Sequence, residues 1–231
     1  MSEDFRFDWN REARTGVPEA VLAENKSIEQ LIAIIKQALE RSHPLLLTRM
    51  SASQHADIAV HCDGVEDFDA ISKTLIIGQS DAPPTLEKNV GASSTKTTMT
   101  RSIGIVAAGT SDVPVASEAA RTLQFYGIPY ALYTDVGVAG LWRLTDIQPE
   151  LNNHSLLIAI AGMEGALFSV LSGLVSSPVI AVRSSVGYGV ASGGTAALHS
   201  ALASCSPGLV TVNIDNGFGA ASAAKKMLSI N

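Results

Sequence analysis

Five short aliphatic runs in the second half of the sequence constrain the fold more than any other feature. Each run is followed by a stretch of about ten to fifteen residues that is compatible with a helix. The runs span residues 103–108, 130–135, 156–162, 179–182 and 210–214. They are continuously apolar rather than alternating, which is typical of strands buried on both faces of a parallel sheet. The pattern therefore predicts five βα units that form a doubly wound, three-layer α/β domain with helices on both faces of the sheet.

The first part of the chain is more charged, and its pattern predicts a small α+β domain. Ser27 begins a capping box, and apolar residues follow it at helical spacing over residues 28–39. The segments after this helix are expected to form a strand, a helix and one or two further strands, at residues 44–48, 52–60 and 68–77. Residues 11–19 have no apolar period, so we expect a solvated arm there.

A change of composition near residue 100 divides the chain. Residues 90–102 are small and polar without hydrophobic periodicity, which indicates a linker. We therefore expect an N-terminal arm and small domain over 1–92, a linker over 93–102 and the α/β catalytic domain over 103–231.

Composition excludes several classes of protein. The 16 basic and 22 acidic residues give a net charge of −6, which provides no basic surface for a nucleic acid. No apolar run reaches the roughly 18 residues of a membrane-spanning helix, so we expect no membrane partner. The charged fraction of 16% lies below the roughly 25% that is typical of soluble proteins, which favours a homo-oligomer. The first twenty residues contain no apolar segment typical of a secretory signal, and two cysteines cannot form a disulfide framework, so we expect a cytoplasmic protein.

The candidate site lies where ligands bind in such sheets, at the carboxyl ends of the strands. The first run is followed by Gly109, Thr110, Ser111 and Asp112. Gly109 permits close approach of the backbone to a ligand, and exposed amides in this turn could bind a phosphate group. The alternative is that Ser111 or Asp112 only caps the following helix, and both interpretations stay open.

Two acids follow the second and third runs, Asp135 and Glu164, and each lies among small residues. The two carboxylates would face one cleft, where either could serve as a general base, a proton donor or a metal ligand. The alternative is that each acid caps the next helix.

A glycine-rich turn follows the fourth run and contains Gly187, Tyr188, Gly189, Gly193 and Gly194. Its spacing misses the dinucleotide fingerprint by one residue, and it follows the fourth strand rather than the first, so the Rossmann match is weak. It is either a loop over a nucleotide or a loop without a ligand. The fifth run is followed by Asp215 and Asn216, which supply a further acid or cap the last helix.

Cys205 precedes the fifth run, at the end of the preceding predicted helix. A lone cysteine is more often a small buried hydrophobic residue than a nucleophile. The carboxyl end of a helix also disfavours a thiolate unless a cation lies nearby, and a positively charged substrate ring would be such a cation. The histidines show no i, i+4 pair, so we expect no structural zinc site.

Taken together, these motifs resemble the LarB family of nickel-pincer nucleotide cofactor biosynthesis. That family is itself similar to aminoimidazole ribonucleotide (AIR) carboxylase of purine synthesis. The resemblance covers nearly the whole chain and is carried by Arg11-x-x-Arg14-x-Gly16-x-Pro18-Glu19 and by AAGTSDVPVA (107–116), DVGVAGLWRL (135–144), AGMEGALFSV (161–170), SSVGYGVASGGTAAL (184–198) and SCSPGLVTVNIDNGFGAA (204–221). Phe168 and Arg183 stand where the family pattern has prolines.

The resemblance implies an activity on nicotinic acid adenine dinucleotide (NaAD), although NAD is not distinguished from it. The pyridinium ring is carboxylated at C5 and the phosphoanhydride is cleaved, which gives pyridinium-3,5-biscarboxylic acid mononucleotide and AMP. The family cysteine matches Cys205, whose thiolate would add to C4 of the ring and make it electron-rich. Glu164 is the first candidate for the base that removes the C5 proton, and Asp135 is the second. CO₂ or bicarbonate is the co-substrate, and no biotin is implied.

The resemblance also assigns supporting roles. Mg²⁺ would assist phosphoanhydride cleavage, with Glu164 or Asp215 as candidate ligands. Ser111, Asp112 and the 187–194 turn would position the ribose and phosphates, and Arg11 and Arg14 would contact anionic groups. By family analogy the homo-oligomer is an octamer.

Two other functions are weighed against this one. The first is AIR carboxylase or mutase activity, against which the sequence has Asp135-Val-Gly137-Val in place of that enzyme's Ser-Ala-His-Arg tract. The second is a non-catalytic nucleotide-binding regulator, which would not need to keep Cys205, Glu164 and Asp112 together.

Overall fold

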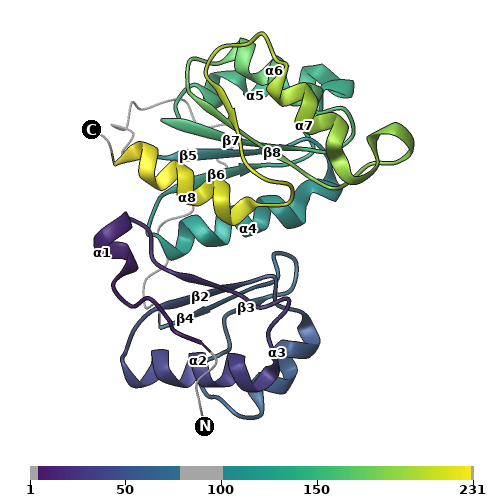
Figure 1. The fold of residues 1–231 in the computed structure, drawn as a ribbon. Coiled ribbons are helices and arrows are strands. Elements are labelled where there is room, and N and C mark those ends of the chain that lie inside the picture. The colour runs from purple at the N-terminus through teal and green to yellow at the C-terminus, as the bar shows by residue number, and fades with distance from the viewer. Residues whose placement is uncertain (1–4, 79–100, 230–231) are drawn as a thin grey trace. The chain divides into compact units, whose positions relative to one another are not determined.

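The computed structural model describes residues 5–78 and 101–229, which form two compact units. Each unit has hydrophobic core clusters of its own. Figure 1 shows the helices and strands of both units. The expected linker, residues 93–102, lies outside the described residues except for its last two positions. No helix within the two described segments is long and apolar enough to cross a membrane.

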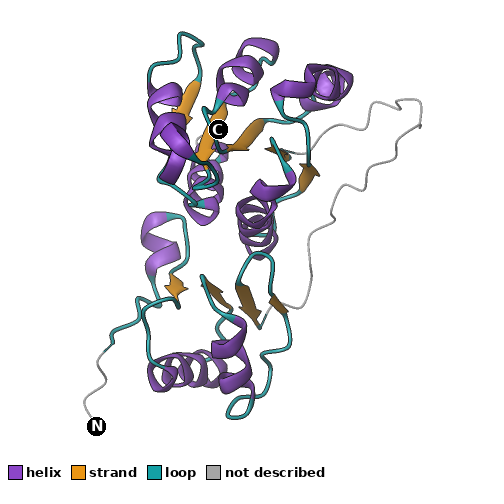
Figure 2. Ribbon diagram, turned by 90° about the vertical axis from the view of Figure 1, so that its right-hand side faces the viewer, coloured by secondary structure: helices purple, strands orange, loops and turns teal. Residues whose placement is uncertain are grey.

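The first unit is a four-stranded mixed sheet covered by helices (Figure 2). Its strand order is β1-β2-β4-β3, in which β1 runs parallel to β2, and β4 runs antiparallel to both β2 and β3. The strands are β1 (Ala20–Leu22), β2 (Leu45–Thr48), β3 (Phe68–Asp69) and β4 (Thr74–Ile77), and the helices are α1 (Arg11–Thr15), α2 (Ile28–Glu40) and α3 (Ala52–Ala59). The predicted small α+β domain is confirmed.

Local signals explain where the first unit's main helices begin. Ser27 and Ser51 each accept a hydrogen bond from the backbone N–H three residues later, and Gln30 and Gln54 complete the two capping boxes. The expected solvated arm over residues 11–19 is wrong in two respects, because Val17 and Pro18 are buried and because residues 11–15 form the short helix α1. That helix buries no side chain, so no apolar period could have predicted it.

The second unit is a five-stranded sheet in which every neighbouring pair is parallel. Its strand order is β6-β5-β7-β8-β9. The strands are β5 (Ile103–Ala107), β6 (Tyr130–Tyr133), β7 (Leu156–Ala161), β8 (Val179–Arg183) and β9 (Leu209–Thr211). The fifth strand begins one residue before the predicted run and ends three residues earlier. The doubly wound, three-layer architecture is confirmed.

Two clusters of buried side chains join the helices to the two faces of this sheet. On one face, α4 (Val113–Phe125) and α8 (Gly217–Leu228) pack against Ile103, Ile105 and their neighbours. On the other face lie α5 (Leu141–Leu151), α6 (Ala166–Leu174) and α7 (Thr195–Leu202). Figure 1 shows the sheet between these two layers of helices. Because all five strands are parallel, their carboxyl ends lie at one edge, where the following loops meet.

Candidate active site

Hydrogen bonds tie together the loops at the carboxyl edge of the second sheet. The hydroxyl of Ser184, after β8, donates to the carboxylate of Asp112, which follows β5. The backbone N–H of Met163, after β7, donates to the carbonyl of Val186 over 2.9 Å. The strand order reverses between β5 and β7, and ligands of doubly wound sheets bind at such a reversal. The geometry therefore centres the candidate site on the turns after these two strands.

The turn after β5 contains one buried acid, Asp112, and two exposed hydroxyl residues. Asp112 is only 4% exposed, and its carboxylate accepts from the backbone N–H of Gly109 over 2.9 Å as well as from Ser184. Asp112 makes no side-chain cap to the first turn of α4, but its bond to Gly109 caps the 3₁₀ turn Thr110–Asp112 that leads into α4, so the capping alternative holds in part. Thr110 and Ser111 are exposed. They are thus the members of this turn that could contact a ligand directly.

Asp135 is engaged by a neighbouring cation. Its backbone is left-handed, with φ of 59°, and its carboxylate forms an ion pair with Arg143 of α5. The pair holds the carboxylate beside that helix. This engagement makes Asp135 less suited than an unpaired acid to serve as a general base.

Glu164 is the acid of this edge that is left unengaged. It is exposed, and its side chain has no hydrogen bond or ion pair to any residue in the described part of the chain. It lies between Met163 and Gly165, which have left-handed backbones with φ of 52° and 69°. The N-cap of α6 is Gly165, without a side-chain cap, so Glu164 does not cap this helix. Its carboxylate can therefore exchange protons with a ligand.

The glycine-rich segment after β8 extends into solvent. Tyr188 is 77% exposed and Val190 is fully exposed. Gly187 lies before Tyr188, and Gly189, Gly193 and Gly194 have left-handed backbones. The segment is anchored below by Arg183, whose Nη2 donates to the carbonyl of Gly193.

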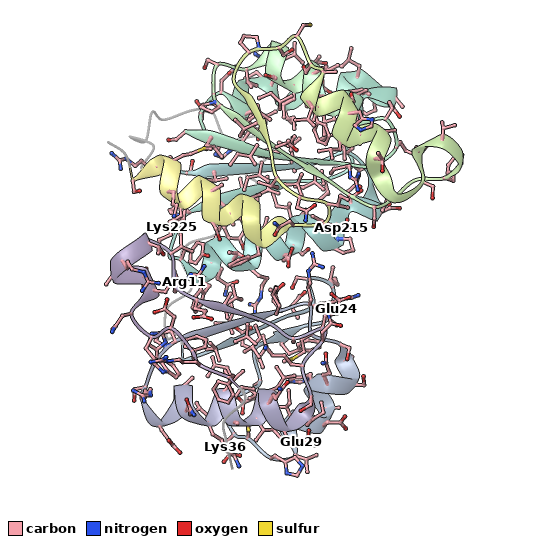
Figure 3. The ribbon with its side chains drawn as sticks, in the orientation of Figure 1. Arg11, Glu24, Glu29, Lys36, Asp215 and Lys225 are labelled. Carbon is pink, nitrogen blue, oxygen red and sulfur yellow. The ribbon has the colours of Figure 1, made fainter. Side chains whose placement is uncertain are left out.

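The turn after β9 fixes one acid and caps one helix. Asp215, which Figure 3 labels near the start of α8, has a φ of 49°, and its carboxylate accepts from the backbone N–H of Ser185 over 2.7 Å. The side chain of Asn216 accepts from the backbone N–H of Gly219 over 2.8 Å. The capping alternative therefore holds for Asn216, and Asp215 links the loop after β9 to the loop after β8.

Cys205 does not lie among these turns. It is exposed in the connection from α7 to β9, which enters the sheet at the opposite, amino end of β9. Its neighbours Ser204 and Ser206 face α6, where both bond to Ser169. The thiol of Cys205 is exposed, and within the described residues no hydrogen bond joins it to the turn that carries Glu164. Within one chain, the structure does not bring Cys205 to Glu164.

Arg11 and Arg14 belong to the first unit, where both lie on α1; Figure 3 labels Arg11. Arg14 forms an ion pair with Asp8, and hydrogen bonding to this guanidinium lowers the pKa of the Asp8 carboxyl group. Arg14 is therefore already engaged by an acid of its own unit.

The acids of the carboxyl edge do not form a ready metal site. In the ranges 5–78 and 101–229, no group of three His, Cys, Asp or Glu side chains is arranged to hold a metal ion. Both acceptor contacts of Asp112 are internal, and Asp135 is paired with Arg143. Mg²⁺ in proteins is often held by one or two carboxylates together with substrate phosphates. The donor set thus does not fit a resident Mg²⁺ held by protein side chains alone.

Sequence reasoning missed three residues at this edge: Met163, Arg183 and Ser184. The left-handed backbone of Met163 has no sequence signal, because methionine has no preference for that conformation. Ser184 becomes notable only through its bond to Asp112, 72 residues away. Arg183 had a signal, since it replaces the proline of the family pattern.

Both units of the chain are similar to known proteins. Residues 3–79 match the family model of the LarB/PurE-like N-terminal domain, and residues 102–231 match that of AIR carboxylase. An uncharacterized protein of Methanocaldococcus jannaschii is 36% identical over 226 residues, which is 95% of this chain and 82% of that protein. Among solved structures, PurE of Treponema denticola is 25% identical, with a TM-score of 0.47 over 57% of this chain and 82% of that chain.

Proposed function

The chain belongs to the LarB family, with a LarB/PurE-like N-terminal domain and an AIR carboxylase domain, and from this membership we propose that it carboxylates a pyridinium nucleotide. The proposed substrates are NaAD, CO₂ and water. The proposed products are pyridinium-3,5-biscarboxylic acid mononucleotide and AMP. Membership of the AIR carboxylase family supports a carboxylase, and the choice of nucleotide is the part that we propose.

The observation that carries the proposal is a pair of exposed reactive groups that the fold does not use. Glu164 is an unengaged acid at a strand end, and Cys205 is an exposed thiol. An exposed acid without a protein partner is accessible to a ligand, and an exposed thiol is accessible for reaction. Their availability supports roles in proton transfer and in covalent catalysis.

These two groups suffice for the carboxylation half of the reaction. The Cys205 thiolate forms a C–S bond to C4 of the pyridinium ring, which converts the ring to a neutral dihydropyridine. C5 is then nucleophilic and bonds to the carbon of CO₂. Glu164 removes the proton from C5, and the released electron pair restores the aromatic ring and expels the thiolate. The net change replaces a C–H bond with a carboxylate and releases one proton.

The second half consumes one water molecule, which cleaves the phosphoanhydride and releases AMP. The exposed hydroxyls of Thr110 and Ser111 are suited to orient the ribose or the phosphates. Mg²⁺ would bind together with the substrate phosphates, since the described protein acids do not form a resident site by themselves.

The separation of Cys205 from Glu164 within one chain favours a site that a second copy of the chain completes. Ala197 in the first turn of α7 lies beside Gly165, and Leu202 ends α7 about 8 Å further along the helix axis. We therefore propose that Cys205 acts on a nucleotide held at the carboxyl edge of another subunit. This arrangement fits the expected homo-oligomer, for which the family suggests an octamer.

The test is incubation of the protein with NaAD, bicarbonate and Mg²⁺, followed by intact-protein mass spectrometry and assay of AMP. The wild type should give a protein adduct, AMP and the carboxylated mononucleotide. Cys205→Ala should give neither the adduct nor the carboxylated product. Cys62→Ala is the matched control, because it removes a buried thiol of the first unit, and it should keep both. Carboxylated product from Cys205→Ala would contradict the proposed nucleophile.

The same assay separates the two other functions. The AIR carboxylase match over residues 102–231 makes AIR the comparison substrate. Turnover of AIR without turnover of NaAD would replace the proposal with purine-type carboxylation. Binding of NaAD without adduct or product would indicate a nucleotide-binding regulator.

A further inference from the structure

Arg183 is an unusual residue for the core of this unit. It is the last residue of β8, is only 1% exposed and is among the largest fully buried side chains of the described chain. Its neighbours along the strand are the aliphatic residues Ile180, Ala181 and Val182, as expected for a central strand. An arginine is almost never fully buried unless it is paired.

The guanidinium of Arg183 is poorly satisfied. Nη2 donates to the carbonyl of Gly193, but Nε and Nη1 have no hydrogen-bond partner. The hydroxyl of Ser184 beside it donates to Asp112 instead. Burial lowers the pKa of Arg183, and the nearby charge of Asp215 opposes that shift. Because the guanidinium stays charged in proteins, its unbonded N–H groups carry a desolvation cost without a compensating acceptor.

The groups around this guanidinium also favour an anion. Gly194 is the N-cap of α7, and a Cβ built on it would lie 2.7 Å from Nε of Arg183. The eight-residue helix α7 therefore begins in contact with the guanidinium, and no side chain caps its first turn. A helix N-terminus presents unpaired N–H groups and a partial positive charge. Two independent features, the buried unsatisfied guanidinium and the uncapped start of α7, thus favour a negatively charged ligand.

We propose that Arg183 and the N-terminus of α7 form a binding site for an oxyanion, namely a phosphate group of the nucleotide substrate. The assignment of this phosphate to a nucleotide substrate rests on the proposed function. The existence of an oxyanion site does not. The phosphate oxygens accept hydrogen bonds from Nε and Nη1 of Arg183 and from amides at the start of α7. Because the carbonyl of Gly193 is the hydrogen-bond partner of Nη2, the oxyanion reaches Nε and Nη1 when the exposed residues 192–193 move outward.

The experiment measures anion binding directly, without turnover. Thermal unfolding of the full chain is followed in increasing inorganic phosphate at constant ionic strength, with chloride, bicarbonate and nicotinate in parallel. Arg183→Met keeps the length of the side chain and removes the charge. Arg121→Met is the matched control, because Arg121 lies on α4 of the same unit and bonds to Gln124.

The wild type and Arg121→Met should show a saturable rise in Tm with phosphate, and Arg183→Met should lose this rise. Without phosphate, Arg183→Met should unfold at the same or a higher temperature than the wild type, because an unsatisfied buried charge has been removed. If Arg183→Met does not fold, Arg183→Lys should still weaken phosphate binding at least tenfold, because it lacks the arginine Nε and Nη1 donors.

Three outcomes would overturn the inference. The first is a wild-type Tm that responds equally to phosphate and chloride. The second is an undiminished phosphate response in Arg183→Met or, if that variant does not fold, in Arg183→Lys. The third is a larger response to bicarbonate or nicotinate, which would assign the site to a carboxylate instead. If the wild type does not turn over NaAD but its Tm still rises with phosphate in an Arg183-dependent way, the proposed function is refuted. The oxyanion site is then still supported.

Discussion

His154 lies buried between Ser102 and Tyr133, and both of its ring nitrogens are hydrogen-bonded. Nδ1 lies 2.9 Å from the hydroxyl of Ser102, and Nε2 lies 2.9 Å from the hydroxyl of Tyr133. Burial lowers the pKa of His154 to about 4, and burial together with the charge of Glu150 raises the pKa of Tyr133 to about 12. Both residues are therefore neutral at pH 7, and the buried network carries no charge.

This neutral histidine predicts an acid-sensitive fold. Between about pH 6.5 and pH 4, the unfolded chain binds a proton at His154 that the folded chain does not bind. The free energy of unfolding should therefore fall as the pH decreases through this window, by up to about 3 kcal/mol. Urea unfolding at pH 7.0, 5.5 and 4.5 measures the change.

The control separates His154 from the other titrating groups. His154→Gln should remove most of this pH dependence, whereas His199→Gln, at an exposed position of α7, should retain it. Equal pH dependence in wild type and His154→Gln would show that other groups cause the acid sensitivity.

Single residues also mark the limit of what the sequence predicts about the site. The positions of Asp112, Asp135, Glu164 and Asp215 after strands follow from the aliphatic runs. The hydrogen-bond partners of these acids do not follow from the runs. Ser184 bonds to Asp112 across 72 residues in the sequence, and Ser185 bonds to Asp215 across 30. Such pairings depend on the strand order β6-β5-β7-β8-β9, which the one-dimensional pattern does not contain. Glu164 therefore becomes distinct from the other acids only in the structure.

At the scale of elements, the predicted helices and strands are those with several buried side chains. The helix after Ser27 and the five parallel strands bury enough apolar residues to leave a pattern in the sequence. The missed elements, α1 and β1, have five and three residues. α1 buries no side chain, and β1 is a strand because it pairs with β2. Short elements that depend on long-range pairing leave no periodic signal.

The contact between α4 and α8 depends on a residue without a side chain. A Cβ on Gly217, the first residue of α8, would lie 2.5 Å from the carbonyl oxygen of Val115 and 2.8 Å from the backbone nitrogen of Ala119. Gly217→Ala should therefore push the helices apart and lower the free energy of unfolding by about 1–3 kcal/mol. Chemical denaturation measures this loss.

Gly173 provides the matched control for this prediction. It lies within α6, and nothing lies within 4 Å of a Cβ built on it. Gly173→Ala should leave the stability unchanged or raise it by about 0.5–1 kcal/mol, because alanine favours the helix. If Gly217→Ala were as stable as Gly173→Ala, the helices would not be in the close contact described.

At the scale of the whole molecule, the groups proposed for catalysis belong to different regions of one domain. Glu164 follows β7 at the carboxyl edge, and Cys205 lies beyond α7 in the connection that leads to the amino end of β9. Several apolar side chains are exposed in the turn after β8, at the end of α7 and on β9: Val186, Tyr188, Val190, Leu202 and Val210. In the proposed shared site, a second copy of the chain supplies the thiol.

Mixing two inactive variants tests whether the site is shared between copies. Cys205→Ala and Glu164→Gln should each abolish carboxylation alone. If the thiol and the acid of one site come from different copies, co-expression of the two variants in equal amounts creates some sites with both groups intact. Random assembly makes about one quarter of the sites complete, so about a quarter of the wild-type activity should return. If both groups come from the same copy, no mixed oligomer contains a complete site. Absence of any activity in a verified mixed oligomer would then contradict the shared site and require the 204–207 connection to rearrange toward Glu164 of its own chain.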